Sequence, residues 1–167
     1  DLVGKIDAKV KTARPGTGYG ICETCGIITN ISGDFFVDKP ESCGPAVPTL
    51  ETKCVDANGV EVAQGEVGEL WVKGGPVIKG YLNRPEATAE SITDGWLHTG
   101  DVARIDEDGF IFIVDRVKDM VLRGGENIYC AEVESVVFKL DGVAECSVFG
   151  VEDDRLGEEV GIAIFPA

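Results

Sequence analysis

Basic residues are scarce in this chain, and no apolar stretch in it is long. Fifteen Lys and Arg stand against 30 Asp and Glu, which gives a formal net charge of −15. Such an acidic surface repels phosphate backbones and anionic membranes, so we expect no nucleic-acid partner. No apolar run reaches the length of a transmembrane helix, and the first ten residues lack the basic and apolar regions of a signal peptide. We therefore expect a soluble, cytoplasmic protein.

The six cysteines give little support for a metal site. Only Cys22 and Cys25 form a CxxC pair, and no second pair completes a four-sulfur zinc site. The pair lies in a glycine-rich stretch and lacks the βαβ context of a thioredoxin-like motif. We expect most of the thiols to be small, buried apolar groups.

Three stretches of different pattern follow one another along the chain. Residues 1–9 carry apolar side chains at helical spacing, which predicts a short helix. From about residue 35 to residue 114, short β-prone runs alternate with turn residues. We predict one hairpin across Asn58-Gly59, a pair that tolerates the positive φ angles of a tight turn, and another across 106–109. Closely spaced hairpins favour a small antiparallel, β-barrel-like subdomain.

After Arg116 the pattern becomes mixed. Apolar residues at helical spacing predict a helix over 131–140, and two β-prone runs predict strands over 144–151 and 160–165. The predicted fold class is therefore mixed α+β, with the β-barrel-like subdomain followed by the start of a small α+β domain. One helix with two strands is too small to bury its own sheet face well, so we expect this second domain to be incomplete.

Several short motifs occur in an order that resembles the adenylate-forming superfamily of acyl-CoA synthetases. They are GTGYGICET at 16–24, GEL at 68–70, GYLNRPEAT at 80–88, WLHTGD at 96–101, DRVKD at 115–119 and GGENIYCAEVE at 124–134. The resemblance covers almost the whole chain but only part of a typical family member. It implies that residues 1–115 are the C-terminal part of a large N-terminal adenylation domain, with its β-rich subdomain at about 35–114. It also implies that residues 116–167 are the first half of a mobile C-terminal domain.

The same resemblance implies a role for individual residues in holding ATP, magnesium and CoA. When a carboxylate attacks the α-phosphate of ATP, the enzyme must hold the base, the ribose, the polyphosphate and magnesium. The resemblance assigns adenine to Tyr19 beside Gly20, magnesium to Glu23 and both ribose hydroxyls to Asp101, because an ionised carboxylate is a pure acceptor. The other implied roles are Arg116 at the ribose, Cys22 near the α-phosphate, Lys118 as the hinge of the mobile domain, and Gly124 with Gly125 beside the pantetheine arm of CoA.

Simpler interpretations of these residues remain open. Tyr19 also fits a buried turn tyrosine, Glu23 a solvated glutamate, Arg116 a surface ion pair, and Lys118 and Gly124-Gly125 ordinary loop residues. The only histidine, His98, invites a general-base role, but in this motif we expect it to be positional. Cys22 stands where the family usually has threonine, so a weaker thiol donor replaces a hydroxyl. The glycines around Tyr19 lack the third glycine of a GxGxxG dinucleotide fingerprint.

The leading hypothesis is a fragment of an AMP-forming carboxylic acid–CoA ligase, with fatty acid metabolism as one setting. The parent would make acyl-AMP from ATP and an acid, and then transfer the acyl group to CoA. The 167 residues contain neither the phosphate loop followed by lysine nor the lysine that the family places near its C-terminal end, so we expect the chain alone to be inactive. The alternatives are a peptide-synthetase or luciferase-like parent, a noncatalytic nucleotide-binding module, and an unrelated acidic β-rich domain.

Overall fold

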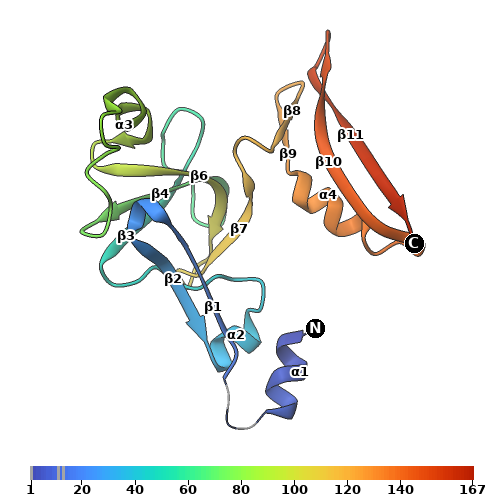
Figure 1. The fold of residues 1–167 in the computed structure, drawn as a ribbon, viewed down its shortest axis with the longest axis horizontal. Helices are drawn as coiled ribbons and strands as arrows, with labels where there is room; N and C mark the ends of the chain where they lie inside the picture. Colours follow the sequence, from blue (N-terminus) through green and yellow to red (C-terminus); the bar gives the residue numbers. More distant parts are fainter. Residues whose placement is uncertain (1, 11, 13) are drawn as a thin grey trace. The chain divides into compact units, whose positions relative to one another are not determined.

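The protein is seen here in a computed structural model that describes residues 2–10, 12 and 14–167 (Figure 1). The chain divides into two compact units, residues 1–113 and residues 114–167. Each unit is described by itself. Strands outnumber helices in both, which confirms the predicted mixed α+β class.

The first unit begins with helix α1 (Leu2–Lys9), as the apolar spacing predicted. An antiparallel pair follows, formed by β1 (Gly16–Ile21) and β2 (Gly26–Ser32) and joined by the 3₁₀ turn η1 (Cys22–Thr24). A short helix, α2 (Asp34–Asp38), then leads toward the main sheet. Residue 1, which the sequence placed in the first helix, lies outside the described residues.

The main sheet of the first unit is antiparallel and has the order β3-β4-β6-β5, with β7 also paired to β6. This curled, half-barrel sheet confirms the β-barrel-like subdomain. Its elements in chain order are β3 (Leu50–Val55), β4 (Val67–Gly74), α3 (Pro85–Ser91), β5 (Ile92–Thr93), β6 (Trp96–Ile105) and β7 (Ile111–Arg116).

The core of the first unit follows from alternation along the strands. Successive side chains of a strand point to opposite faces, so Leu70 and Val72 of β4 are fully buried while Trp71 between them packs on the other face. Ile28 of β2 and Ile111 of β7 are also fully buried and belong to the same core cluster as Leu70. The core therefore joins the small β1–β2 pair to the main sheet.

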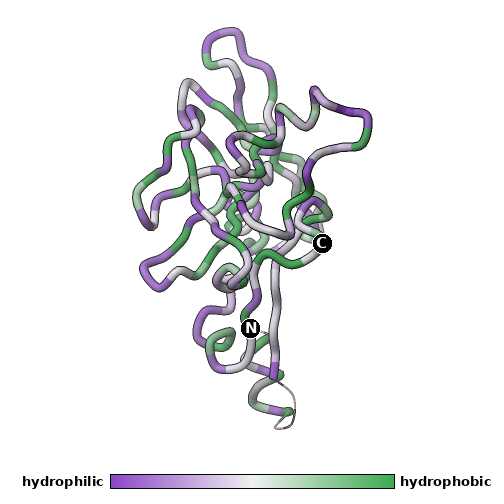
Figure 2. Tube along the Cα trace, turned by 90° about the vertical axis from the view of Figure 1, so that its left-hand side faces the viewer, coloured by the Kyte–Doolittle hydropathy of each residue, from purple (hydrophilic) through white to green (hydrophobic). Residues whose placement is uncertain are grey.

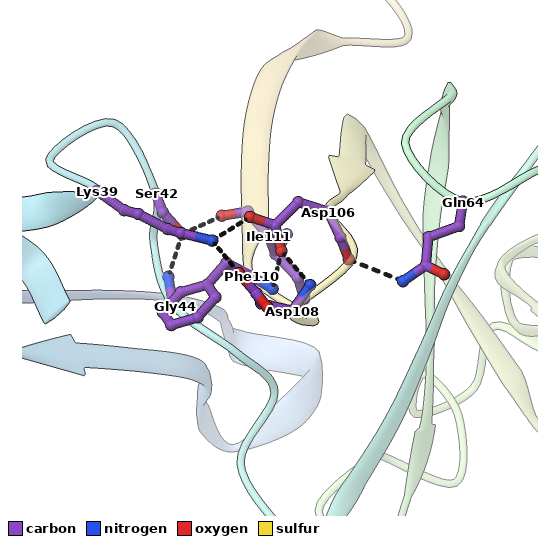
Figure 3. Close-up of polar contacts among 8 residues, drawn as sticks. All are labelled: Lys39, Ser42, Gly44, Gln64, Asp106, Asp108, Phe110 and Ile111. Carbon is purple, nitrogen blue, oxygen red and sulfur yellow. Dashed lines mark hydrogen bonds and ion pairs between the residues drawn. The ribbon is translucent and has the colours of Figure 1, made fainter.

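The hairpin predicted across 106–109 is present as β6 and β7, and a network of polar contacts fixes its turn (Figure 3). Lys39 Nζ lies 2.5 Å from Asp106 Oδ2 and 2.9 Å from Asp108 Oδ2, and 4.3 Å above the centre of the Phe110 ring. Gln64 Nε2 donates to the Asp106 carbonyl oxygen at 2.9 Å. The turn is thus held from two separate segments of the chain.

The hairpin predicted across Asn58-Gly59 is also present, with a short return run. In its turn, Asp56 Oδ1 accepts the N–H groups of Asn58 and Val60. The Asp56 N–H donates to the Val60 carbonyl at 2.8 Å, the Val62 N–H donates to the Cys54 carbonyl at 3.0 Å, and Val55 forms an antiparallel bridge with Glu61. The return run is short because the next turn begins at Gln64, and β3 also pairs along its whole length with β4.

The second unit contains a small sheet with one helix. Its elements are β8 (Val121–Arg123), β9 (Glu126–Ile128), α4 (Cys130–Val137), β10 (Val143–Asp153) and β11 (Gly157–Pro166), with the sheet order β10-β11-β8-β9. Helix α4 ends before the predicted residue 140, because the N–H groups of Lys139 and Leu140 bond to carbonyls three residues back. The core cluster consists of Val121, Cys130 and Val148, while Phe149 and Phe165 remain exposed.

Hydrophobic and hydrophilic stretches alternate over short distances along the trace (Figure 2). Among the described residues, no helix is both long enough and apolar enough to cross a membrane.

Candidate functional site

Two of the predicted site residues, Tyr19 of β1 and Asp101 of β6, meet in the first unit. The Tyr19 hydroxyl donates a hydrogen bond of 2.5 Å to Asp101 Oδ2, across 82 positions of sequence. Asp101 is only 7% exposed. Burial first, and then the hydrogen bond to Asp101, raise the pKa of Tyr19, so the hydroxyl remains the donor and the carboxylate the acceptor. The fold therefore unites the GTGYG and HTGD motifs.

The glycines beside Tyr19 allow β1 to lie close against β2. A Cβ at Gly18 would lie 2.6 Å from the Thr29 carbonyl oxygen, and a Cβ at Gly20 would overlap the carbonyl of Gly26. A side chain at either position would push the strands apart. The register shift between Tyr19 and Gly20 lies at this same point.

The Thr29 side chain makes a hydrogen bond to the backbone of Tyr19. Its hydroxyl accepts the Tyr19 N–H at 3.1 Å and donates to the Cys43 carbonyl oxygen at 2.6 Å. Thr29 is fully buried, so this hydroxyl satisfies two main-chain groups in the interior. Sequence reasoning missed Thr29, because nothing in its own neighbourhood marks it.

Asp101 is presented by a β-bulge in β6. Glu69 of β4 pairs with Val102, and Trp71 pairs with His98, so the three residues from Thr99 to Asp101 face a single residue, Leu70. A bulge of this kind interrupts the ladder and redirects a side chain. The Thr99 hydroxyl closes the bulge, because it donates to the Leu70 carbonyl at 2.7 Å and accepts the Asp101 N–H at 3.1 Å.

Glu23 lies in the turn η1, where Tyr81 of the GYLNRPEAT segment and Ile78 just before that segment anchor it. The Tyr81 hydroxyl donates to Glu23 Oε1 at 2.8 Å, and the Ile78 N–H donates to the Glu23 carbonyl at 2.8 Å. The hydrogen bond to Glu23, followed by burial, raises the pKa of Tyr81. Tyr81 was not among the residues predicted from the sequence, although it lies within a motif that was.

The carboxylate of Glu23 is chemically suited to bind a magnesium ion whose other ligands are phosphate oxygens and water. No group of three or more His, Cys, Asp or Glu side chains that could hold a metal occurs within residues 2–10, 12 and 14–167. Magnesium bound mainly through phosphates and water needs only one or two protein carboxylates, so a single glutamate is chemically sufficient.

The cysteines are less buried than we expected. All six are free thiols, but only Cys54 and Cys130 are buried, whereas Cys22 and Cys25 are exposed. Cys22 opens the turn η1, and Cys25 adopts a left-handed conformation with φ of 56° at its end. The expectation of mostly buried thiols is wrong because the glycine-rich segment turns at the surface, where Cys22 stays accessible beside Glu23.

His98 packs against Trp71. The two rings are stacked, with centroids 4.0 Å apart and planes inclined by 9°. Its Nε2 is buried and has no hydrogen-bond partner among the residues that the structure describes. A ring held in this way is suited to packing, in keeping with the positional role expected for it.

The remaining predicted residues belong to the second unit or to its start. The Arg116 carbonyl accepts the N–H groups of Asp119 at 3.0 Å and Met120 at 3.2 Å, so a tight turn carries the exposed Lys118. Gly124 and Gly125 have φ angles of 60° and 91° and form the turn between β8 and β9. Their relation to the residues of the first unit stays a prediction.

Comparison with known proteins finds a matching family model and similar enzymes. The model of the family described as AMP-binding enzyme matches residues 3–82. A long-chain-fatty-acid–CoA ligase of Salmonella typhimurium is 48% identical over 147 residues, which are 88% of this chain and 26% of that protein.

Solved structures are similar over nearly the whole chain. The o-succinylbenzoate CoA synthetase of Bacillus subtilis in complex with its acyl-adenylate intermediate has a TM-score of 0.87 and 37% identity, covering 99% of this chain and 34% of that one. The same enzyme in complex with ATP and magnesium has a TM-score of 0.85 and 37% identity, with coverage of 98% and 33%. The chain thus spans between 26% and 34% of the length of these matched chains.

Proposed function

We propose that this chain, which belongs to the AMP-binding enzyme family, is part of an ATP-dependent, AMP-forming acid–CoA ligase. The observation that carries the proposal is the hydrogen bond between Tyr19 and Asp101. It brings an aromatic ring and a buried carboxylate to one place, which is what an adenosine group requires. The similarity to a fatty-acid–CoA ligase and to an enzyme solved with ATP, magnesium and an acyl-adenylate supports the same reaction.

In this proposal the first unit holds the nucleotide. The Tyr19 ring lies against adenine, with Gly20 leaving room for the close approach of the backbone. Asp101 accepts hydrogen bonds from the ribose hydroxyls, and the Tyr19 hydroxyl keeps its carboxylate in position. Glu23, held by Tyr81, is the protein ligand of magnesium, which neutralises phosphate charge when bound.

Two displacements make up the reaction. The carboxylate of the acid attacks the α-phosphate, and the bond to the β-phosphate breaks to release pyrophosphate. The thiol of CoA then attacks the acyl carbonyl, and AMP leaves with the electron pair of the broken bond. Cys22 stands near the α-phosphate in this scheme and offers it only a weak thiol donor.

The second unit is the start of the mobile domain in this proposal. Residues 1–115 then form the end of the adenylation domain and residues 116–167 the first half of the C-terminal domain, with Lys118 as the hinge. The boundary between the two compact units, after residue 113, supports this division. Arg116 contacts the ribose, and Gly124 with Gly125 line the path of the CoA arm. A cytoplasmic location also stays a prediction.

The test is AMP release from ATP by the full-length protein, with short, long and aromatic carboxylic acids, in the presence and absence of CoA. We expect AMP release that depends on both acid and CoA. Asp101→Ala should lower it by about 100-fold or more, because two hydrogen bonds to a charged group are lost and each is worth about 1.5–3 kcal/mol. Asp38→Ala, at an exposed aspartate of the same unit, is the matched control and should keep full activity.

The outcomes separate the candidate functions. Acid-dependent pyrophosphate exchange without a need for CoA would favour a peptide-synthetase or luciferase-like parent. ATP binding without turnover of any acid would favour a noncatalytic nucleotide-binding module. The 167-residue chain alone should release no AMP, and turnover by it would contradict that expectation.

A further inference from the structure

Glu69 of the GEL segment makes two hydrogen bonds, one to the bulge that carries Asp101 and one to Trp71 of β4. Its Oε1 accepts the N–H of Gly100 at 3.0 Å, and its Oε2 accepts the indole N–H of Trp71 at 2.9 Å. Gly100 directly precedes Asp101 and has φ of 73°, a conformation that favours glycine. The carboxylate therefore fastens the middle residue of the bulge to β4.

The support for Glu69 is itself rigid. Trp71 is 9% exposed and is stacked on His98, so its indole N–H has a fixed direction. The bulge is thus held at two points. Glu69 accepts the Gly100 N–H from one side, and Thr99 bridges the Leu70 carbonyl and the Asp101 N–H from the other.

We propose that Glu69 is a positioning residue for nucleotide recognition, which acts by setting the direction of the Asp101 carboxylate toward the ribose hydroxyls. The inference rests on the proposed function, since that function gives Asp101 its ligand. Both partners of Glu69 are N–H donors, so the position requires two acceptors at once. A carboxylate provides them, whereas a glutamine side chain provides one acceptor and one NH₂ donor.

The experiment compares the dissociation constants of ATP and 2′,3′-dideoxy-ATP, measured by isothermal titration calorimetry on the full-length protein without acid or CoA. The wild type should prefer ATP, because only ATP offers the ribose hydroxyls to Asp101. Glu69→Gln places an NH₂ group against an N–H donor, either that of Trp71 or that of Gly100, and so loosens the hold on Gly100. We expect the substitution to weaken ATP binding by about tenfold. The affinity for the dideoxy nucleotide should stay close to that of the wild type.

A second substitution tests the cause. Trp71→Phe removes the indole N–H and keeps an aromatic ring against His98, so in the double variant the glutamine oxygen can turn freely to Gly100. We expect Glu69→Gln with Trp71→Phe to regain most of the preference for ATP. Glu51→Gln, at an exposed glutamate of β3, is the matched control and should leave both affinities unchanged.

Each outcome decides between explanations. Equal weakening of both nucleotides in Glu69→Gln, or an unchanged preference for ATP, would overturn the positioning role. Further loss in the double variant would do the same, because it would indicate general damage to the sheet. If Asp101→Ala keeps the full preference for ATP, the proposed contact between Asp101 and the ribose is refuted. This result differs from one in which Asp101→Ala loses the preference but Glu69→Gln keeps it, which would refute only the positioning role of Glu69.

Discussion

Replacement of Thr29 by valine tests how the site is held together. Valine has nearly the shape of threonine, so the change leaves no cavity and removes only the hydroxyl. The Tyr19 N–H and the Cys43 carbonyl then lose the partner that they share in the interior. A buried polar group left unsatisfied costs about 1–3 kcal/mol, so we expect Thr29→Val to lower the free energy of unfolding by about 2–4 kcal/mol.

The assay is urea denaturation of the purified chain, followed by tryptophan fluorescence. The chain has two tryptophans, Trp71 and Trp96, and both lie in the first unit, so the signal reports on that unit. With a denaturant dependence of about 2 kcal/mol per molar urea, the midpoint should fall by roughly 1–2 M.

Two control variants separate the hydroxyl from other effects. Thr29→Ser keeps the hydroxyl and should cost only about 1 kcal/mol for the lost methyl group. Thr93→Val, at an exposed position of β5, should change stability by less than about 0.5 kcal/mol. If Thr29→Val were as stable as the wild type while Thr29→Ser were weaker, the methyl group and not the hydroxyl would matter, and the reasoning would be refuted.

Three further predictions concern magnesium, pH and thiol reactivity. Tyr81→Phe removes the donor to Glu23 and should raise the magnesium concentration for half-maximal AMP release of the full-length protein by about tenfold, with little change in its melting temperature. For Asp106, partial burial opposes ionisation, but Lys39 and the N–H groups of Phe110 and Asp108 outweigh it and lower the pKa below 3.8. Its stabilisation is therefore complete above that value and is lost as the pH falls through the lower folded-state pKa. Lys39→Met should reduce this acid-induced loss in urea denaturation between about pH 2 and pH 5, and an unchanged pH profile would refute it. Burial first, and then Glu61, raise the pKa of Cys54 to about 11, so iodoacetamide at about pH 8 should label the exposed Cys22 and Cys25 well before Cys54, as read by mass spectrometry.

Local patterns predicted the elements that are regular over several residues. Helix α1, the β6–β7 hairpin and the strands β10 and β11 follow directly from apolar spacing and turn residues. Helix α3 was missed, although Pro85 at its first turn is a common start signal, because the helix is short and has no buried residue to give a periodic pattern. The hairpin across Asn58-Gly59 also follows from its turn residues, although its return run forms an isolated bridge and not a full strand.

The candidate site was predictable as a set of residues but not as an arrangement. Tyr19 and Asp101 could be chosen from their motifs, yet their contact spans most of the first unit and depends on how β1 and β6 are placed. Glu69 and Tyr81 act through partners about 31 and 58 positions away, and no local pattern in the sequence specifies such pairs. Non-local strand pairing is the step that sequence periodicity does not supply.

The bulge in β6 also limits how this sheet can be redesigned. Three residues face one residue of β4, so deletion of Thr99 and Gly100 would restore a regular ladder. That ladder would place the aspartate opposite Leu70, which is fully buried, and an unpaired carboxylate in an apolar core is costly. A screen for thermal stability alone would therefore retain the bulge, and any effort to stabilise this sheet should change residues outside Thr99–Asp101.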